Sequence, residues 1–380
     1  MEGKNMKIAA VAVVAVIVIA AAAVVIGGGV TESEKKGLYK LDAEFVEVSM
    51  GQCSATPSVI LTLETVYEAY YGDYTDKEYT IDDVKADEAF WNEFCAWTPL
   101  VTDNGDGTFD VVSQTKAKGS ETVTIPKVAS MVTLGTMYSE TLYFLLCEQY
   151  GVEPYSDAGL SNDSVGEAMK KHIAGGMQYS YYEQNEGVYM TAYIDESEYM
   201  DLGVTSVQKV DPEVLTKVLA DAKADNGDVI YMASGTRIND DKYYQANTNP
   251  AKSTGTYYAF FSPSTFGDVC SCIDAIGKLM GFDETVINGL IDDFQIRLYT
   301  VYKSVEENAE SEKPKVYWES NTGKAVSSSM AKTIMEFLGF DTKLMDGAEH
   351  DMESLLSEKP SLLCFYTNDD RPMDEKMRTV

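Results

Sequence analysis

The residues ETVINGLIDDFQIRLYTVYKSVEENA, at positions 284–309, carry the longest helical pattern in the 380-residue chain. Apolar side chains recur there at alternating intervals of four and three residues, namely Ile287, Ile291, Phe294, Leu298, Val301 and Val305. This spacing is typical of one face of an α-helix. At about 1.5 Å per residue, it predicts a single rod of roughly 39 Å.

Similar orders of strands and helices flank this rod on both sides. Upstream, residues 127–233 begin and end with apolar strand patterns that enclose helical ones. Downstream, residues 315–366 repeat that order, from a strand at Lys315–Glu319 to a strand at Ser361–Tyr366. The repetition predicts an α/β protein with two Rossmann-like lobes joined by a long backbone helix. Since open α/β sheets bind ligands beyond the carboxyl ends of their strands, we expect a binding cleft between the lobes.

The patterns divide the chain into five parts. These are a signal or membrane anchor (1–29), an accessory N-terminal α+β region (38–125), the first α/β lobe (126–267), the connecting backbone helices (268–312) and a short second α/β lobe (313–380). Within the accessory region we expect a strand at Glu44–Met50, helices at Val59–Tyr71 and Glu88–Trp97, and a hairpin turning at 103–107. The helices of this region are candidates to cover the short second lobe.

Charge and composition exclude several classes of function. The chain has 61 Asp and Glu against 30 Lys and Arg, which gives a net charge of −31. Such an acidic protein repels nucleic acid and anionic lipid, so neither is an expected partner. With two histidines in the chain, a site built from several histidines is excluded. The 45% hydrophobic content is enough for an ordinary core.

An unbroken apolar run from Ile8 to Ile26 follows Lys4 and Lys7. Nineteen helical residues span about 28 Å, close to the roughly 30 Å thickness of the membrane hydrocarbon. The run therefore predicts an uncleaved membrane anchor. A cleaved signal peptide and a buried core helix are the alternatives. With an anchor or a signal, the remainder of the chain is exported to the cell surface or a periplasm-like space.

Six cysteines fit an exported chain that holds one or two disulfides. Their spacing is not that of a zinc site. Three of them lie in apolar helical patterns and are expected to be small buried residues, namely Cys147, Cys270 and Cys272.

Four segments together resemble one protein family. They are Lys127–Val132 followed by Tyr138–Tyr143, Ser262–Val269 followed by Ile276–Gly281, Phe294–Val305 followed by Lys313–Glu319, and Met352–Tyr366. In this order they resemble the helical-backbone (class III) periplasmic binding proteins. Those are the substrate-binding components of ABC importers for ferric siderophores, haem and cobalamin. The likeness covers about 126–366.

The resemblance implies docking on an ABC permease, with its ATPase, through one glutamate in each lobe. Glu140 matches the first docking position. At the second the chain has Thr333, and Glu336 lies one turn away. The second lobe also ends at Val380, before the family's final strands and helices.

Aromatic and basic residues near the predicted strand ends are the candidate ligand contacts. Tyrosine and tryptophan offer large flat surfaces with a polar tip, which suits a bulky planar or chelated ligand. Arginine after a strand end suits carboxylates or the negative charge of a chelate. The expected contacts are Thr133, Tyr138, Tyr179, Tyr181, Arg237, Tyr257, Trp318, Asn321 and Arg371.

The sequence therefore predicts an anchored, extracellular substrate-binding protein of an ABC importer. Its ligand would be a metal chelate such as an iron siderophore, haem or a corrinoid, and no resident cofactor or metal is expected. The alternative is a membrane-anchored surface interaction or sensor protein that reuses the fold without transport. An enzyme is not expected, because the S-x-x-K match at Ser329–Lys332 has no accompanying catalytic motif.

Overall fold

The computed structural model describes residues 43–48, 55–72, 77–177, 192–194, 199–204, 206–308, 312–319, 323–327 and 330–366. Their contacts form two compact units. Unit 1 contains Ala55–Ser58 and Tyr79–Arg297, whereas unit 2 contains the strand at 44–48, Val59–Glu78 and the described residues from Leu298 onward. The predicted rod is a single helix, α12 (Glu284–Asn308), which begins in unit 1 and ends in unit 2.

Unit 1 is built on a five-stranded parallel sheet in the order β7-β6-β5-β8-β9. The strands are β5 (Ser130–Leu134), β6 (Ile173–Gly176), β7 (Met200–Asp201), β8 (Val229–Ser234) and β9 (Tyr257–Phe261). From β5 the chain first moves outward through β6 to β7. It then returns to the other side of β5 for β8 and β9. This reversal makes the gap between β5 and β8 the topological switch point of the sheet.

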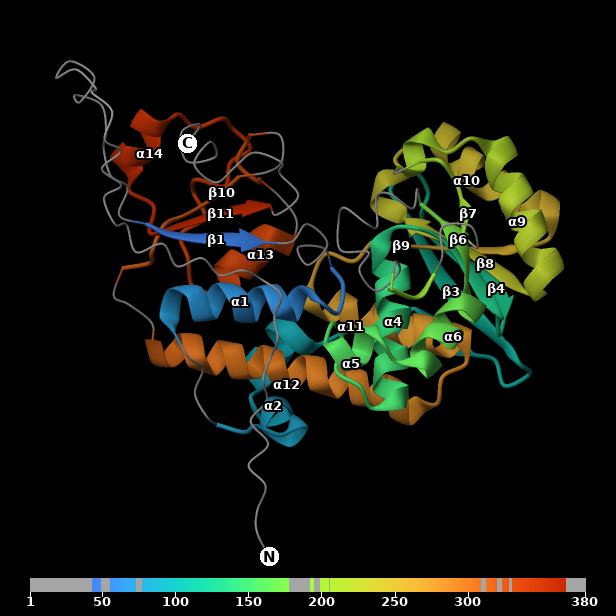
Figure 1. Cartoon of the computed structure of the whole chain (residues 1–380), viewed down its shortest axis with the longest axis horizontal. Coiled ribbons are helices and arrows are strands. Elements are labelled where there is room, and N and C mark those ends of the chain that lie inside the picture. Colours follow the sequence, from blue (N-terminus) through green and yellow to red (C-terminus); the bar gives the residue numbers. More distant parts are fainter. Residues whose placement is uncertain are drawn as a thin grey trace, which may run out of the picture. The chain divides into compact units, whose positions relative to one another are not determined.

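Helices connect these strands (Figure 1). They are α4 (Thr136–Tyr150), α5 (Asp157–Leu160), α6 (Asp163–His172), α9 (Pro212–Asn226), α10 (Asp241–Thr254) and α11 (Phe266–Met280). Asp211 caps α9 with Pro212 at its first position, and Thr265 with Asp268 forms a capping box on α11. Crossovers in the two directions place α4 and α10 on opposite faces of the sheet.

The predicted hairpin forms a small antiparallel sheet within unit 1. It consists of β2 (Val101–Asp103), β3 (Thr108–Thr115) and β4 (Gly119–Pro126). Before it come α2 (Ile81–Ala86), α3 (Glu88–Phe90) and a π-helical turn at Trp91–Cys95. Asp103 and Asp106 accept hydrogen bonds from the turn's own backbone, as expected of an ordinary hairpin turn.

Unit 2 contains a three-stranded parallel sheet in the order β1-β11-β10. Its strands are β1 (Glu44–Val48), β10 (Val316–Glu319) and β11 (Leu362–Tyr366), and its helices are α1 (Val59–Tyr71), α13 (Met330–Phe337) and α14 (Met352–Glu358). Figure 1 shows β1 beside β11, although the two strands are more than 300 residues apart in sequence. The expected accessory region is thus shared between the two units, with β1 and α1 in unit 2.

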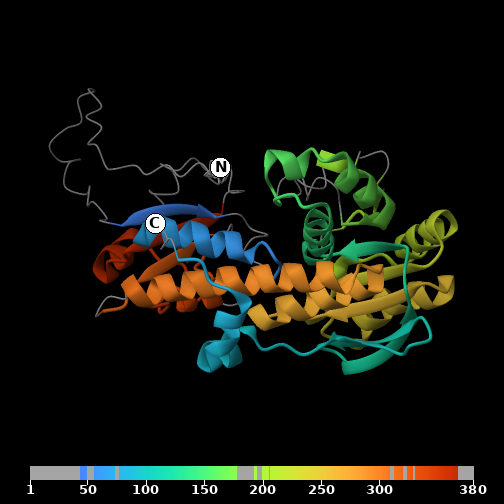
Figure 2. The same ribbon diagram turned by 90° about the horizontal axis from the view of Figure 1, so that it is seen from below.

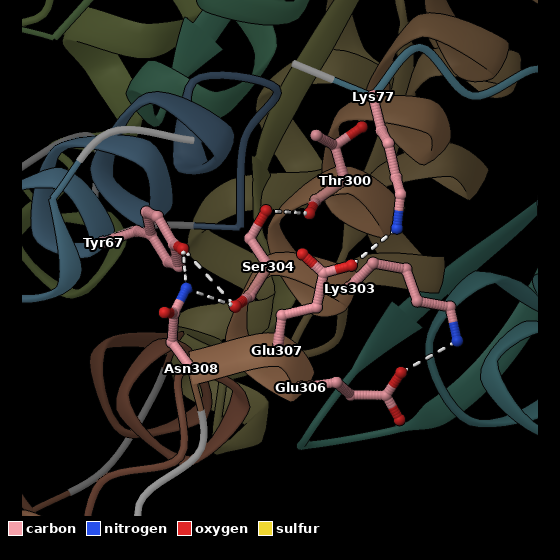
Figure 3. A network of polar contacts seen from close by, with 8 residues as sticks. All are labelled: Tyr67, Lys77, Thr300, Lys303, Ser304, Glu306, Glu307 and Asn308. Carbon is pink, nitrogen blue, oxygen red and sulfur yellow. Dashed lines mark hydrogen bonds and ion pairs between the residues drawn. The ribbon is translucent and has the colours of Figure 1, made fainter. Parts of the chain in front are cut away.

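Helix α1 lies along the C-terminal half of α12 (Figures 1 and 2). Figure 3 shows the polar contacts between them. The Tyr67 hydroxyl donates to the Ser304 carbonyl (3.4 Å) and accepts from Asn308 Nδ2 (2.8 Å). Lys77, which follows α1, forms an ion pair of 2.6 Å with Glu307. Because Tyr67 is fully buried, its hydroxyl depends on these partners.

We expect Tyr67→Phe to destabilise the protein by about 1 kcal/mol, because it removes a buried hydroxyl and one partner of Asn308. Urea unfolding followed by circular dichroism measures the change. Tyr150→Phe is the control, since Tyr150 is 40% exposed. Equal stability of the two variants would contradict the role given to Tyr67.

Candidate functional site

The carboxyl ends of β5 and β8 lie side by side, because Leu134 pairs with Ala233 at the end of the register. Gly135 follows β5 and is the N-cap of α4, with φ 155° and no side-chain cap. Ser234 ends β8, and its hydroxyl lies 2.9 Å from that of Thr236. Uncapped helix N–H groups and hydroxyls therefore meet at the switch point of the sheet, where open α/β sheets bind ligands.

Arg237 adds a positive charge to this edge. It ends the short 3₁₀ turn Gly235–Arg237 directly after β8, and its side chain is exposed. Its carbonyl accepts from Gln208 Nε2 (3.1 Å), which fixes the backbone at that point. A guanidinium, hydroxyls and a helix N-terminus all favour an anionic, oxygen-rich group. Of the expected ligand contacts, Arg237 is placed best for that role.

The β3–β4 hairpin packs on the same turn. Lys116 N donates to the Gly235 carbonyl (3.2 Å), and Ala117 N donates to the Ile238 carbonyl (2.9 Å). A Cβ atom on Gly235 would lie 1.8 Å from the Gln114 carbonyl oxygen, so this position requires glycine. The sequence analysis missed this contact. The sequence feature that could have indicated this contact is the run of small and polar residues Ser234–Thr236 directly after an apolar strand.

We expect Gly235→Ala to displace the hairpin and to cost about 1–3 kcal/mol of stability, because backbone atoms cannot yield as a flexible side chain can. Thermal unfolding measures the loss. Thr236→Ala is the neighbouring control, because its side chain is exposed and only its hydroxyl contact with Ser234 is lost. If both variants unfold at the same temperature as the wild type, Gly235 does not have the role described here.

Tyr138 is a core residue, which corrects its interpretation as a ligand contact. Its hydroxyl donates to the Ala233 carbonyl (2.5 Å) and accepts from Phe261 N (3.1 Å), so it joins α4 to the ends of β8 and β9. It is fully buried, and burial raises its pKa well above the ordinary value. Tyr138 therefore positions this edge of the sheet and does not face a ligand.

Three other expected contacts are also placed unfavourably. Thr133 in β5 and Trp318 in β10 are fully buried. Tyr257 is the first residue of β9, so it lies at the amino end of the parallel sheet, opposite the carboxyl edge. Thr133 and Trp318 lie in strands that are buried on both faces, and strand direction decided the position of Tyr257. The remaining expected contacts lie outside the described residues, namely Tyr179, Tyr181, Asn321 and Arg371.

The two expected docking glutamates differ in exposure. Glu140 is buried in α4 with 2% of its surface exposed, so its carboxylate is not available to a permease in this conformation. Glu336 in α13 is exposed, accepts from Thr342 Oγ1 (3.0 Å) and lies 3.7 Å from Lys332 Nζ. Of the two expected docking glutamates, Glu336 is therefore the exposed one.

The cysteines are buried free thiols within the described part of the chain. They are Cys95, Cys147, Cys270, Cys272 and Cys364. Burial raises the pKa of Cys95 and of Cys147 to about 12. The disulfides expected of an exported chain are thus not found among these five, whereas the prediction of small buried residues is confirmed. Cys53 lies outside the described residues.

Two surface hollows lie away from the carboxyl edge. One, of about 910 Å³, is in unit 2 at the amino ends of β10 and β11, between Lys315, Asp341 and Ser361. The other, of about 630 Å³, lies between α4 and α6 in unit 1. Within the described ranges, no group of three or more His, Cys, Asp or Glu side chains is placed to hold a metal ion.

Comparisons with known proteins give only distant likenesses. No family model matches the chain, and no curated protein matches it. A periplasmic solute binding protein from Veillonella parvula is 15% identical, with a TM-score of 0.47 over 69% of this chain and 70% of that chain. The heme binding protein HmuT is 17% identical, with a TM-score of 0.41 over 72% of this chain and 76% of that chain.

Because both TM-scores are below 0.5, the fold is assigned from the strand order and connections of the chain itself. The chain is an α/β protein, with a parallel sheet in each unit and one helix, α12, that runs through both.

Proposed function

We propose that the chain is the substrate-binding component of an ABC importer. The observation that carries the proposal is the parallel sheet of unit 1, whose switch point between β5 and β8 has Ser234, Thr236 and Arg237 at its edge. A second parallel sheet in unit 2 and the continuous helix α12 support it. So does the order of the four family-like segments. We propose capture of the ligand at the carboxyl edge of unit 1.

The proposed ligand is an anionic metal chelate, namely a ferric siderophore, haem or a corrinoid. An exposed arginine next to hydroxyls and an uncapped helix N-terminus suits the carboxylates or the net negative charge of such a chelate. We propose binding without catalysis. Presentation to the permease would then depend on Glu336, because Glu140 is buried.

The first experiment is thermal unfolding of the purified protein with a panel of ferric siderophores, haem and corrinoids. A ligand at about a hundredfold over its Kd stabilises the folded state by about 2.7 kcal/mol, which raises the Tm by a few degrees. Arg237→Ala should reduce the shift, because it removes a charged hydrogen-bond donor. Lys217→Ala is the matched control, since Lys217 lies on the exposed side of α9 with 79% of its side chain exposed.

A second candidate function is a surface interaction or sensor protein without transport. The burial of Glu140 favours it, because a docking residue of the family is then inaccessible. A cooperative melt that no member of the panel shifts would support this second candidate over the first. A shift from one chelate class that Arg237→Ala abolishes would support the first.

We also propose that residues 8–26 anchor the protein to the cytoplasmic membrane, with the remainder exported. This run lies outside the described residues; within them, no helix is long and apolar enough to cross a bilayer. Membrane fractionation of cells expressing the full chain should recover it with the membranes after washing with high salt and carbonate. Replacing Val14 and Val18 with Asp should release it, because charges in the hydrocarbon are costly. Recovery of a shorter, soluble mature chain would instead indicate a cleaved signal.

A further inference from the structure

Glu140 is enclosed by three segments of unit 1. It projects from the second turn of α4, and the loop after that helix brings the Tyr155 hydroxyl to its Oε1, to which it donates. The turn Ala55–Ser58, which directly precedes α1, supplies Thr56 and Ser58. These two hydroxyls lie 2.9 Å apart, and both side chains are fully buried. Glu140 therefore holds a turn that is more than 80 positions away in sequence.

The surroundings of this carboxyl disfavour its charge. Burial raises the pKa of Glu140 above its ordinary 4.5, and the nearby hydroxyls of Thr56, Tyr155 and Ser58 offset that only in part. Oε2 is buried without a hydrogen-bond partner among the described residues. Tyr155 is the titratable group that faces the carboxyl, and within the described part of the chain no charged side chain contributes to the shift. An ionised Glu140 would thus be a buried charge without a counterion.

Tyr155 is held beside the carboxyl at a conformational cost. Its φ of 59° is in the left-handed region, which residues other than glycine seldom adopt. Its backbone N–H donates to the Tyr143 hydroxyl (3.0 Å), and its ring packs edge-on against Tyr143 and Phe144. A strained backbone that persists because its surroundings determine it often marks a functional position. Glu140 therefore lies in an ordered cluster of side chains, in which Tyr143 and Phe144 hold Tyr155 beside the carboxyl.

We propose that Glu140 is a proton-controlled clasp for the Ala55–Ser58 turn. With the carboxyl neutral, the turn stays packed on α4. When the proton leaves to water, the charged carboxylate is stable only if water reaches it, so the turn opens. This proposal is independent of the proposed transport function, because it concerns how the chain is held before α1 and not what the sheet edge binds.

The direction of the pH dependence follows from the raised pKa. Below about pH 4.5 the carboxyl is neutral whether the turn is open or closed, and the clasp is fully effective. As the pH rises from there, the open form ionises first, and the equilibrium constant for opening grows by up to about tenfold per pH unit. The equilibrium constant for opening stops rising once the pH passes the raised pKa that Glu140 has in the closed form.

Hydrogen exchange of the full chain, followed by mass spectrometry on the peptide that covers 55–58, measures this opening. Rates from pH 5 to pH 8 are divided by the intrinsic exchange rate, which itself depends on pH. The wild type should show opening that rises with pH, whereas Glu140→Gln, which stays neutral, should show constant opening. The matched control is Glu148→Gln. Glu148 is on the same helix and also has a pKa raised by burial, but it faces Gly289 of α12. In this control, opening of the 55–58 turn should still increase with pH as it does in the wild type.

Tyr155→Phe gives a second, graded test that remains available if Glu140→Gln does not fold. It removes a hydrogen bond that favours the charged form, so the pKa of Glu140 rises further and the upper end of the pH window moves to higher pH. A wild-type opening that is constant or falls with pH would overturn the proposal. So would an undiminished rise in Glu140→Gln, or a window that does not move in Tyr155→Phe.

Discussion

The parallel pairing of β1 with β11 is the interaction on which unit 2 depends. β11 is the central strand of a three-stranded sheet, and its backbone groups need a partner on each side. β10 supplies one side, and β1 supplies the other from near the start of the chain. Without β1, the apolar strand β11 would be an exposed edge, which invites aggregation.

After β1 the chain continues through α1, which packs on the helices of unit 2. Tyr67 contacts Ser304 and Asn308 of α12, and Tyr71 donates to the Leu338 carbonyl at the end of α13 (2.9 Å). α1 is therefore tied to the C-terminal half of α12 and to the end of α13. Unit 2 is thus formed by β1 and α1 from the N-terminal part of the chain together with the residues from Leu298 onward.

Unit 1 shows how one small residue can shape a candidate site. Gly235 lets the β3–β4 hairpin approach the end of β8, where Lys116 N and Ala117 N donate to the carbonyls of Gly235 and Ile238. Ser234, Thr236 and Arg237 lie at this end of β8. The Tyr138 hydroxyl joins the ends of β8 and β9 through Ala233 and Phe261. These contacts fix the backbone at the edge that we propose for binding.

Local sequence patterns determined most of the helices and strands of this protein. The rod at 284–309 and the helix at Val59–Tyr71 follow from periodicity, because 3.6-residue repeats report which face of a helix is buried. Caps such as Asp211–Pro212 fixed helix starts for the same local reason. Arg237 was predicted as a ligand contact because it directly follows a clear strand.

Only the tertiary structure decided where those elements go and which polar residues are exposed. Nothing near β1 indicates that it pairs with a strand at 362–366, since parallel pairing is a property of two distant segments. Glu140 matched a docking position by its place in the sequence, yet the turn at 55–58 and Tyr155 bury it. Burial depends on what packs from elsewhere in the chain, and a local pattern carries no information about that.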